Sequence, residues 1–531
     1  MNLVAKNLLV AMMPVVLIGC SSAGKRSGGG GDTDSIADTA VIAAKPAMEV
    51  VLPDTAYASA QRVKYSIEVI DTLNSGILES TVDIYASVPG QFTFRGGERR
   101  DAAFGGRLDS VPSRFEVDWR FDTEEDYTAT SVGTWGGGTG WTGQPLYVEW
   151  PDSCMRRFRS AGLVDGDFSG REIMVGSLAA KVYFIDFMTG KPSRPAIDVT
   201  NPIKGTISLD PTLNGNLYVG QGVPAHGKMG ALVIDLNKGL MTHFFGPDPK
   251  AQRGWGAYDS SAIRVGQFLF RPGENGGVYK FLVEPGGLKL HSVLRYTVGG
   301  YAPGIEASMS VYANYGYVAD NAGNVLCINL NTLNPVWYYK LPDDVDATPV
   351  ICEEADRNIY VYTGCEVEHG GVAEARFVKL DALTGREVWV NHTPARRAEL
   401  GEKHFDGGYY ATALPGVGDC IDLIFTNVVR NDDDKMNGSF VAYDRATGHT
   451  RYSVKLRYYA WSSPVGFIGP DGEMYVVTGD CAGRMYLIRG RDGEIINVQQ
   501  IGANFESSPV VVGNSLVVGS RGKSIYKITL K

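Results

Sequence analysis

The sequence predicts an all-β protein, and three observations support this fold class. A strand–turn–strand pattern recurs along most of the chain, a second marker of small residues recurs in phase with it, and the 531-residue composition includes 66 Gly and 27 Tyr. Repeats of roughly 40 to 50 residues with several short strands and one turn signature are typical of propeller blades. We therefore predict an eight-bladed β-propeller closed by an N-terminal strand.

The clearest copy of the repeat is FVKLDALTGREVW at residues 377–389. Val378 and Leu380 alternate with polar neighbours, as in a half-buried strand, and a tight turn follows from Asp381 to Gly385. The Asp carboxylate accepts hydrogen bonds from amides of the turn, and Gly supplies the positive φ that other residues resist. The turn positions of the eight copies are Asp186, Asp235, Val283, Asn329, Asp381, Asp444, Arg489 and Thr529.

Each unit also opens with a short run of small residues. Such residues suit the innermost strand of a blade, because the blades crowd around the axis there. The runs are GQP at residue 143, KGTI at 204, SSA at 260, EAS at 306, ATP at 347, ATA at 411, SSP at 462 and SSP at 507. The agreement of the two markers predicts eight blades.

Residues 115–122, FEVDWRFD, alternate between polar and apolar residues like a strand. Trp119 has the position in this strand that Trp389 has in the repeat. The last copy ends at Lys531 without such a strand. We expect the N-terminal strand to complete the eighth blade, because closing the ring removes exposed sheet edges.

On these residues, the chain resembles the pyrroloquinoline-quinone (PQQ)-type β-propeller repeat family, whose units carry the pattern LDAxTGxxxW. The resemblance covers residues 115–531, and residues 380–389 match closely. It implies that Trp337 and Trp389, and Trp119 by analogy, dock between neighbouring blades. Tyr452 replaces Trp in another unit. The family also includes a lipoprotein of the outer-membrane barrel-assembly machinery and the quinoprotein dehydrogenases.

The N-terminus is typical of a lipoprotein signal peptide, residues 1–19. Lys6 precedes an apolar run too short to span a bilayer, and the run ends in LIGC at Cys20. We expect Cys20 to carry the acyl chains that anchor the protein, with a plain secretory signal as the alternative. Ser21, rather than Asp, follows the Cys. In proteins that resemble this one, that favours the outer membrane, and we expect the periplasmic face.

The remaining chain divides into three predicted parts. Residues 20–44 contain GGGG and few large apolar residues, which indicates a flexible tether. Residues 45–110 have strand-like alternation followed by an Arg/Gly-rich stretch, and we expect a small capping segment packed on the propeller. Residues 111–531 form the propeller.

Charge and cysteines limit the function classes. The formal net charge is −9, and no basic stripe is visible, so a nucleic-acid partner is disfavoured. Six cysteines remain besides Cys20, and both disulfides and buried thiols are compatible with their wide spacing. Cys352 and Cys365 form the first pair to test.

Catalytic signals are weak. Quinoprotein dehydrogenases resemble one another in an adjacent Cys pair and a calcium site, and this chain has no adjacent Cys pair, so we expect neither PQQ nor calcium as a cofactor. The seven His are scattered without a metalloprotease motif. EVEHGG at residues 366–371 is interpreted as a solvated loop, and NDDDKMNG at 431–438 lacks the EF-hand spacing. We therefore predict a protein that is not an enzyme and holds no metal.

A candidate binding site emerges from the position just before each inner strand, where one residue per blade faces a shared axial funnel. The eight positions hold Thr142, Lys204, Asp259, Glu306, Asp346, Tyr410, Trp461 and Glu506. Like charges facing one another repel unless a cation joins them, so the acids predict binding of a cation, a sugar or a basic segment. Further apolar walls are expected from Trp141, Trp255, Tyr258, Tyr409, Tyr459 and Phe505.

Two classes of binding protein are favoured over an enzyme. One is a membrane-anchored scaffold that binds an envelope protein, as in outer-membrane protein assembly. The other is a binder of glycans or small ligands that uses the aromatic residues of the funnel. A PQQ-dependent dehydrogenase is the third alternative.

Overall fold

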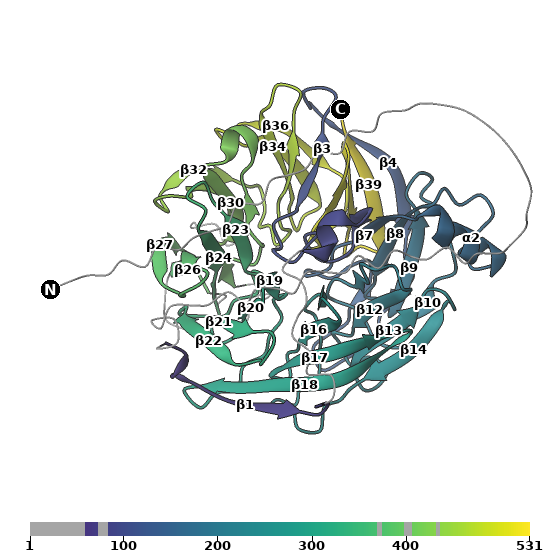
Figure 1. Cartoon of the computed structure of the whole chain (residues 1–531). Coiled ribbons are helices and arrows are strands. Elements are labelled where there is room, and N and C mark those ends of the chain that lie inside the picture. The colour runs from purple at the N-terminus through teal and green to yellow at the C-terminus, as the bar shows by residue number, and fades with distance from the viewer. Residues whose placement is uncertain (1–58, 73–82, 369–373, 398–405, 432–435) are drawn as a thin grey trace, which may run out of the picture. The chain divides into compact units, whose positions relative to one another are not determined.

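The computed structural model describes residues 59–72, 83–368, 374–397, 406–431 and 436–531, which all belong to one compact unit, Lys45–Lys531. The predicted signal peptide, Cys20 and the tether lie outside the described residues. Eight blades follow one another around a common centre in chain order (Figure 1). The predicted all-β, eight-bladed propeller is therefore confirmed.

Each blade has four antiparallel strands, and we call the first of the four its inner strand and the last its outer strand. The strands of blades 1 to 4 are β7 (Leu146–Glu149), β8 (Arg171–Gly176), β9 (Lys181–Asp186) and β10 (Ile197–Asp198); β11 (Ser208–Leu209), β12 (Asn216–Gly220), β13 (Ala231–Asp235) and β14 (Leu240–Phe245); β15 (Ile263–Val265), β16 (Phe268–Pro272), β17 (Gly277–Glu284) and β18 (Gly287–Val298); and β19 (Ser310–Tyr312), β20 (Tyr315–Ala319), β21 (Asn324–Asn329) and β22 (Pro335–Lys340).

The strands of blades 5 to 8 are β23 (Val350–Glu353), β24 (Ile359–Gly364), β26 (Glu374–Asp381) and β27 (Glu387–Pro394); β29 (Leu414–Pro415), β30 (Leu423–Val429), β31 (Gly438–Asp444) and β32 (Thr450–Lys455); β33 (Val465–Ile468), β34 (Met474–Gly479), β35 (Arg484–Arg489) and β36 (Ile495–Gln500); and β37 (Val510–Val512), β38 (Ser515–Gly519), β39 (Ser524–Leu530) and β4 (Phe115–Asp122).

The ring closes as predicted. The outer strand of blade 8 is β4, which comes from the N-terminal side and pairs antiparallel with β39 from Leu530↔Phe115 to Ser524↔Asp122. In Figure 1 the dark β4 lies beside the yellow β39. This pairing ties the two ends of the propeller together.

A tryptophan latch joins neighbouring blades. The Trp337 indole of blade 4 donates to the carbonyl of Ala382 in blade 5 at 2.8 Å, and its ring packs on Gly385, where an added Cβ would come within 2.5 Å of the ring. The glycine of the turn is therefore needed for its φ of +69° and for this close approach. The equivalent latches are Trp119 to Phe187 and Gly190, Trp389 to Arg445 and Gly448, and Tyr452 to Gly490 and Gly493.

The described residues of the segment before β4 pack on the propeller and add strands to existing blades. β1 (Val63–Val69) extends the outer edge of blade 3, β2 (Gly90–Gln91) pairs with β7, and β3 (Phe104–Arg107) pairs with β33 in parallel. Between β2 and β3, Arg95 and Arg100 are fully buried.

These two arginines tie the segment to the inner strands around the axis. Arg95 donates to the carbonyls of Pro464 and Ala413, and Arg100 donates to those of Met309 and Ser261. Four different blades are thus bound by two side chains. A guanidinium suits this role, because its donors form a planar fork that reaches several acceptors at once.

The remaining elements are small. They comprise β5 (Glu125–Asp126), β6 (Gly136–Gly137), β25 (Glu366–Val367), β28 (Gly407–Gly408), α2 (Asp152–Ser160) and the 3₁₀ turns η1 (Ile84–Ser87) and η2 (Gly418–Cys420). None of the helices in the described residues is both long and apolar enough to cross a membrane.

The six cysteines in the described residues are buried free thiols. Cys352 and Cys365 are not paired, because Cys352 of β23 lies opposite Tyr360 in β24, and Cys365 comes after the end of that strand. The disulfide alternative is therefore wrong for this pair, and the buried-thiol alternative describes all six.

Candidate functional site: an acidic axial funnel

The structure brings the residues before the inner strands together. A cavity of about 310 Å³ at this end of the axis, which we call the axial funnel, is lined by Lys204, Glu306, Asp346, Tyr410, Trp461 and Glu506. A narrow continuation of about 20 Å³ is lined by Thr142 and Phe94. Asp259 is buried and reaches the site through its ion pair with Lys204. All eight predicted positions thus belong to one region.

A series of hydrogen bonds to hydroxyl groups links blades 3 to 8 next to these positions. Residues two places further along each strand face the same way, because side chains alternate with a period of two. At this position, the backbone N–H of a residue in one blade donates to the side-chain hydroxyl of the equivalent residue in the next blade. The bonds run from Ser261 to Ser308 (2.8 Å), Ser308 to Thr348 (3.0 Å), Thr348 to Thr412 (3.2 Å), Thr412 to Ser463 (3.0 Å) and Ser463 to Ser508 (3.1 Å). The small-residue marker therefore also supplies these acceptors, which sequence reasoning missed.

One wall of the funnel is aromatic. Trp141, Tyr410 and Trp461 contact one another, with ring centroids 5.6 Å apart for Trp141–Tyr410, 5.5 Å for Trp141–Trp461 and 5.1 Å for Tyr410–Trp461. Aromatic faces attract cations and stack on sugars or planar groups.

Not all of the expected apolar walls line the funnel. Tyr258, Tyr409 and Phe505 pack in the cores of their blades. Each directly precedes a funnel residue in the sequence, and neighbouring side chains of an extended segment point to opposite sides. The same alternation that places Tyr410 in the funnel turns Tyr409 away from it.

The second wall holds a buried lysine between carboxylates. The Lys204 ammonium lies 2.5 Å from Asp259 and 3.4 Å from Glu306. Burial alone would lower the pKa of Lys204, but the charges of Asp259, Glu306 and Glu274 outweigh it and hold this pKa well above its ordinary value. The side chain is therefore a permanent internal cation.

This lysine bears on metal binding. Within the described residues, one group of acids, Asp259, Glu274 and Glu306, has ligand atoms within 4.8 Å of one another. The ammonium of Lys204 already lies between two of these carboxylates and pairs with both. The arrangement therefore does not fit a resident calcium ion, which would have to displace a buried positive charge.

The third wall is acidic and comes mainly from blade 5. Asp344, Asp346, Glu366 and Glu368 all line the funnel. Burial raises the pKa of Asp346, and the charge of the neighbouring Glu306 raises it further. Burial also raises the pKa of Glu366, and the charge of Asp346 raises it further. Such carboxyl groups hold protons at a higher pH than free ones.

Glu366 was missed by sequence reasoning. Its segment was interpreted as a solvated loop, but Glu366 lies in β25, pairs with Gly408 of β28 and is 3% exposed. The interpretation was wrong because an isolated two-residue strand has no periodicity to reveal it. Half of the motif at residues 431–438, namely residues 432–435, lies outside the described residues.

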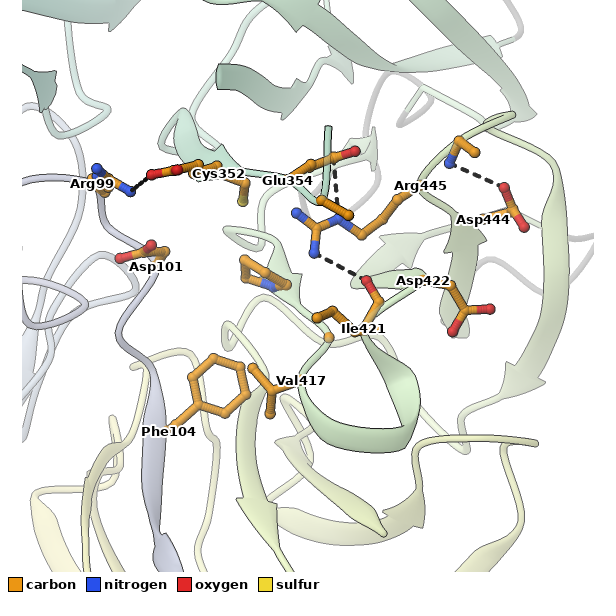
Figure 2. Close-up of a pocket in the computed structure, with 15 residues that line it drawn as sticks. Arg99, Asp101, Phe104, Cys352, Glu354, Val417, Ile421, Asp422, Asp444 and Arg445 are labelled. Carbon is orange, nitrogen blue, oxygen red and sulfur yellow. Dashed lines mark hydrogen bonds and ion pairs between the residues drawn. The ribbon is translucent and has the colours of Figure 1, made fainter. Parts of the chain in front are cut away.

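A larger cavity of about 680 Å³ lies at the other end of the inner strands, between blades 5 and 6 and the segment before β4 (Figure 2). Its charges are largely paired within the protein. Glu354 binds Lys379 at 2.8 Å and Arg445 at 3.3 Å, and Asp422 binds Arg491 at 2.6 Å.

A thiol in this larger cavity is also unsuited to catalysis. Burial raises the pKa of Cys352 to about 12, so the group stays a thiol at neutral pH and is a poor nucleophile. The axial funnel, whose lining holds more acids than cations, is therefore the better candidate site.

Comparison with known proteins finds similarity at the level of structure and none at the level of sequence families. No protein-family model and no curated protein matches the sequence. Similar solved structures include a europium-containing methanol dehydrogenase (13% identity, 84% of this chain and 99% of that chain, TM-score 0.56) and quinohemoprotein alcohol dehydrogenase from Comamonas testosteroni (13%, 89% and 83%, 0.56). BamB from Moraxella catarrhalis aligns with a TM-score of 0.48 (14%, 68% and 94%).

Identities this low show a shared propeller fold and no more. One fold can host unrelated functions, so the function depends on the residues of the site.

Proposed function

We propose that this protein is a non-catalytic, lipid-anchored propeller of the bacterial cell envelope that binds a basic segment of a partner protein in its axial funnel. The observation that carries the proposal is the excess of acid in the funnel. Seven carboxyl groups line it, against the two cations Lys204 and Arg521. Both cations are engaged, Lys204 with Asp259 and Glu306, and Arg521 with Glu506 at 3.3 Å.

A basic segment complements this site in two ways. Its ammonium or guanidinium groups would compensate the carboxylates, whose repulsion is strong in a partly desolvated funnel. Its stems would lie on the rings of Tyr410 and Trp461, where cation–π attraction adds to the binding.

A glycan or another small ligand is the second candidate. The contact among Trp141, Tyr410 and Trp461 favours it, because a sugar ring stacks on an exposed aromatic face and carboxylates accept its hydroxyl hydrogens.

A PQQ-dependent dehydrogenase is the least compatible alternative. PQQ is itself a tricarboxylate, and the funnel lining is dominated by acids, so cofactor and wall would repel each other. These residues do not fit the cofactor.

The envelope location rests on the sequence. The apolar run that ends in LIGC predicts acylation of Cys20, and Ser21 favours the outer membrane with the propeller on its periplasmic face. A role in outer-membrane protein assembly is the scaffold function most consistent with that location.

The test is affinity isolation of the full chain from detergent-solubilised envelopes. We expect a stoichiometric protein partner, and we expect the double variant Glu306→Ala, Trp461→Ala to lose most of it. The matched control is Glu116→Ala with Tyr127→Ala, an exposed acid and an aromatic residue that is 65% exposed, outside the funnel. Partner retention by the funnel variant contradicts the proposal, and retention that free glycan abolishes supports the second candidate.

A further inference from the structure

We infer that the acidic wall of the axial funnel takes up a lysine or arginine side chain in exchange for protons held by Asp344, Asp346 and Glu366. The inference rests on the proposed function and specifies it further, because it names the group that is bound and couples its binding to pH.

The geometry of the wall carries this inference. Glu366 is 3% exposed, and its Oε1 has no hydrogen-bond partner in the described part of the chain. Asp344 Oδ1 is buried and has none either. A buried carboxylate oxygen without a donor is costly, and protonation of the group or the arrival of a cation relieves that cost.

The groups that face this wall are mostly acids. They are Asp344 and Asp346 before β23, Glu366 and Glu368 in and after β25, Asp406 and Tyr410 on either side of β28, and Glu306 of blade 4 with its partner Lys204. The second lining cation, Arg521, pairs with Glu506. Neither cation is therefore committed to the carboxyl groups of blade 5.

Burial is the main cause that raises the pKa of Asp344, Asp346 and Glu366, and neighbouring carboxylates raise each further. These groups consequently hold their protons to a higher pH than free carboxyl groups do. When an ammonium or guanidinium enters, it favours the ionised form. The O–H bond of a carboxyl group then breaks, the proton passes to the solvent buffer, and the cation takes its place.

The affinity for the entering cation should therefore increase with pH. Below the raised pKa values the protons must be expelled, so affinity should rise by about tenfold per pH unit for each proton released. Above those values the wall is already ionised, and the affinity should level off.

The probe is a tetralysine peptide, titrated into the detergent-solubilised full chain by calorimetry at one pH in phosphate and in Tris. These buffers take up protons with different enthalpies, so the difference in apparent binding enthalpy counts the protons released. We expect release of about one proton or more by the wild type. Glu366→Gln preserves the shape of the side chain and removes a titrating group, and it should release fewer protons.

The control is Glu116→Gln, an exposed acid of β4 outside the funnel, which should match the wild type. Equal apparent enthalpies in both buffers, with the same Kd at pH 6 and pH 8, overturn the inference and leave the proposed function standing. Tetralysine that does not bind at all overturns both.

Discussion

At the scale of single residues, Lys204 determines the electrostatics of the funnel. It is buried, and its ammonium contacts Asp259 and Glu306. Removing one partner of a buried ion pair leaves the other charge uncompensated, and this costs far more than the loss of an exposed pair.

Lys204→Ala should lower the free energy of unfolding by about 3–5 kcal/mol. The reason is that Asp259 and Glu306 keep their positions without a counter-charge. Equilibrium unfolding in urea measures the change.

The matched control is Lys181→Ala. Lys181 binds Glu124 at 2.5 Å, but the Glu124 side chain is 64% exposed, so the loss should stay below about 1 kcal/mol. If both variants lose the same amount, Lys204 does not have the role assigned to it.

At the scale of elements, the latch between blades explains why the repeat keeps both Trp and Gly. The indole donates across the blade boundary, and the glycine of the next turn leaves room for the ring. One motif therefore encodes a turn within its own blade and a docking surface for the preceding blade.

Gly385→Ala should destabilise the protein through strain at a positive φ and, in addition, through a clash with the Trp337 ring. Its φ is +69°, and the new Cβ would meet the Trp337 ring at 2.5 Å. Gly472 has a φ of +86° with nothing within 4 Å, so Gly472→Ala isolates the strain, about 1 kcal/mol.

We expect the Gly385 variant to lose about 1–3 kcal/mol more than the Gly472 variant in urea unfolding, since overpacking adds to strain. Equal losses would show that the latch contact does not contribute to stability.

At the scale of the whole molecule, ring closure and the predicted lipid anchor involve different parts of the chain. β4 closes the ring through β39, whereas the predicted anchor, Cys20, lies outside the described residues. The attachment to the membrane is therefore expected to depend on the acyl chains and not on the propeller.

Cys20→Ser should move the protein from the membrane fraction to the soluble fraction, because each buried methylene of an acyl chain contributes about 0.8 kcal/mol. Fractionation followed by immunoblotting measures the distribution. A propeller variant such as Gly472→Ala should stay in the membrane fraction. Unchanged membrane association of Cys20→Ser would contradict the lipoprotein assignment.

Patterns in the sequence are enough to predict the blade count, the closing strand and the eight positions before the inner strands. These features depend on local patterns, namely a period of two, a turn with Asp and Gly, and small residues at a fixed phase. Because every blade repeats the same geometry, a position found in one blade, such as Trp461, predicts the place of Tyr410 in another.

The neighbours of these residues, in contrast, depend on how the chain folds in three dimensions. The pairing of Glu366 with Gly408, the pairing of Lys204 with Asp259, and the passage of Arg95 and Arg100 among the inner strands join residues far apart in the sequence. Burial and charge compensation are properties of such long-range contacts, and no local pattern records them. For that reason the sequence locates the funnel, whereas the burial of Lys204 and the unpaired oxygens of Asp344 and Glu366 are visible only in the fold.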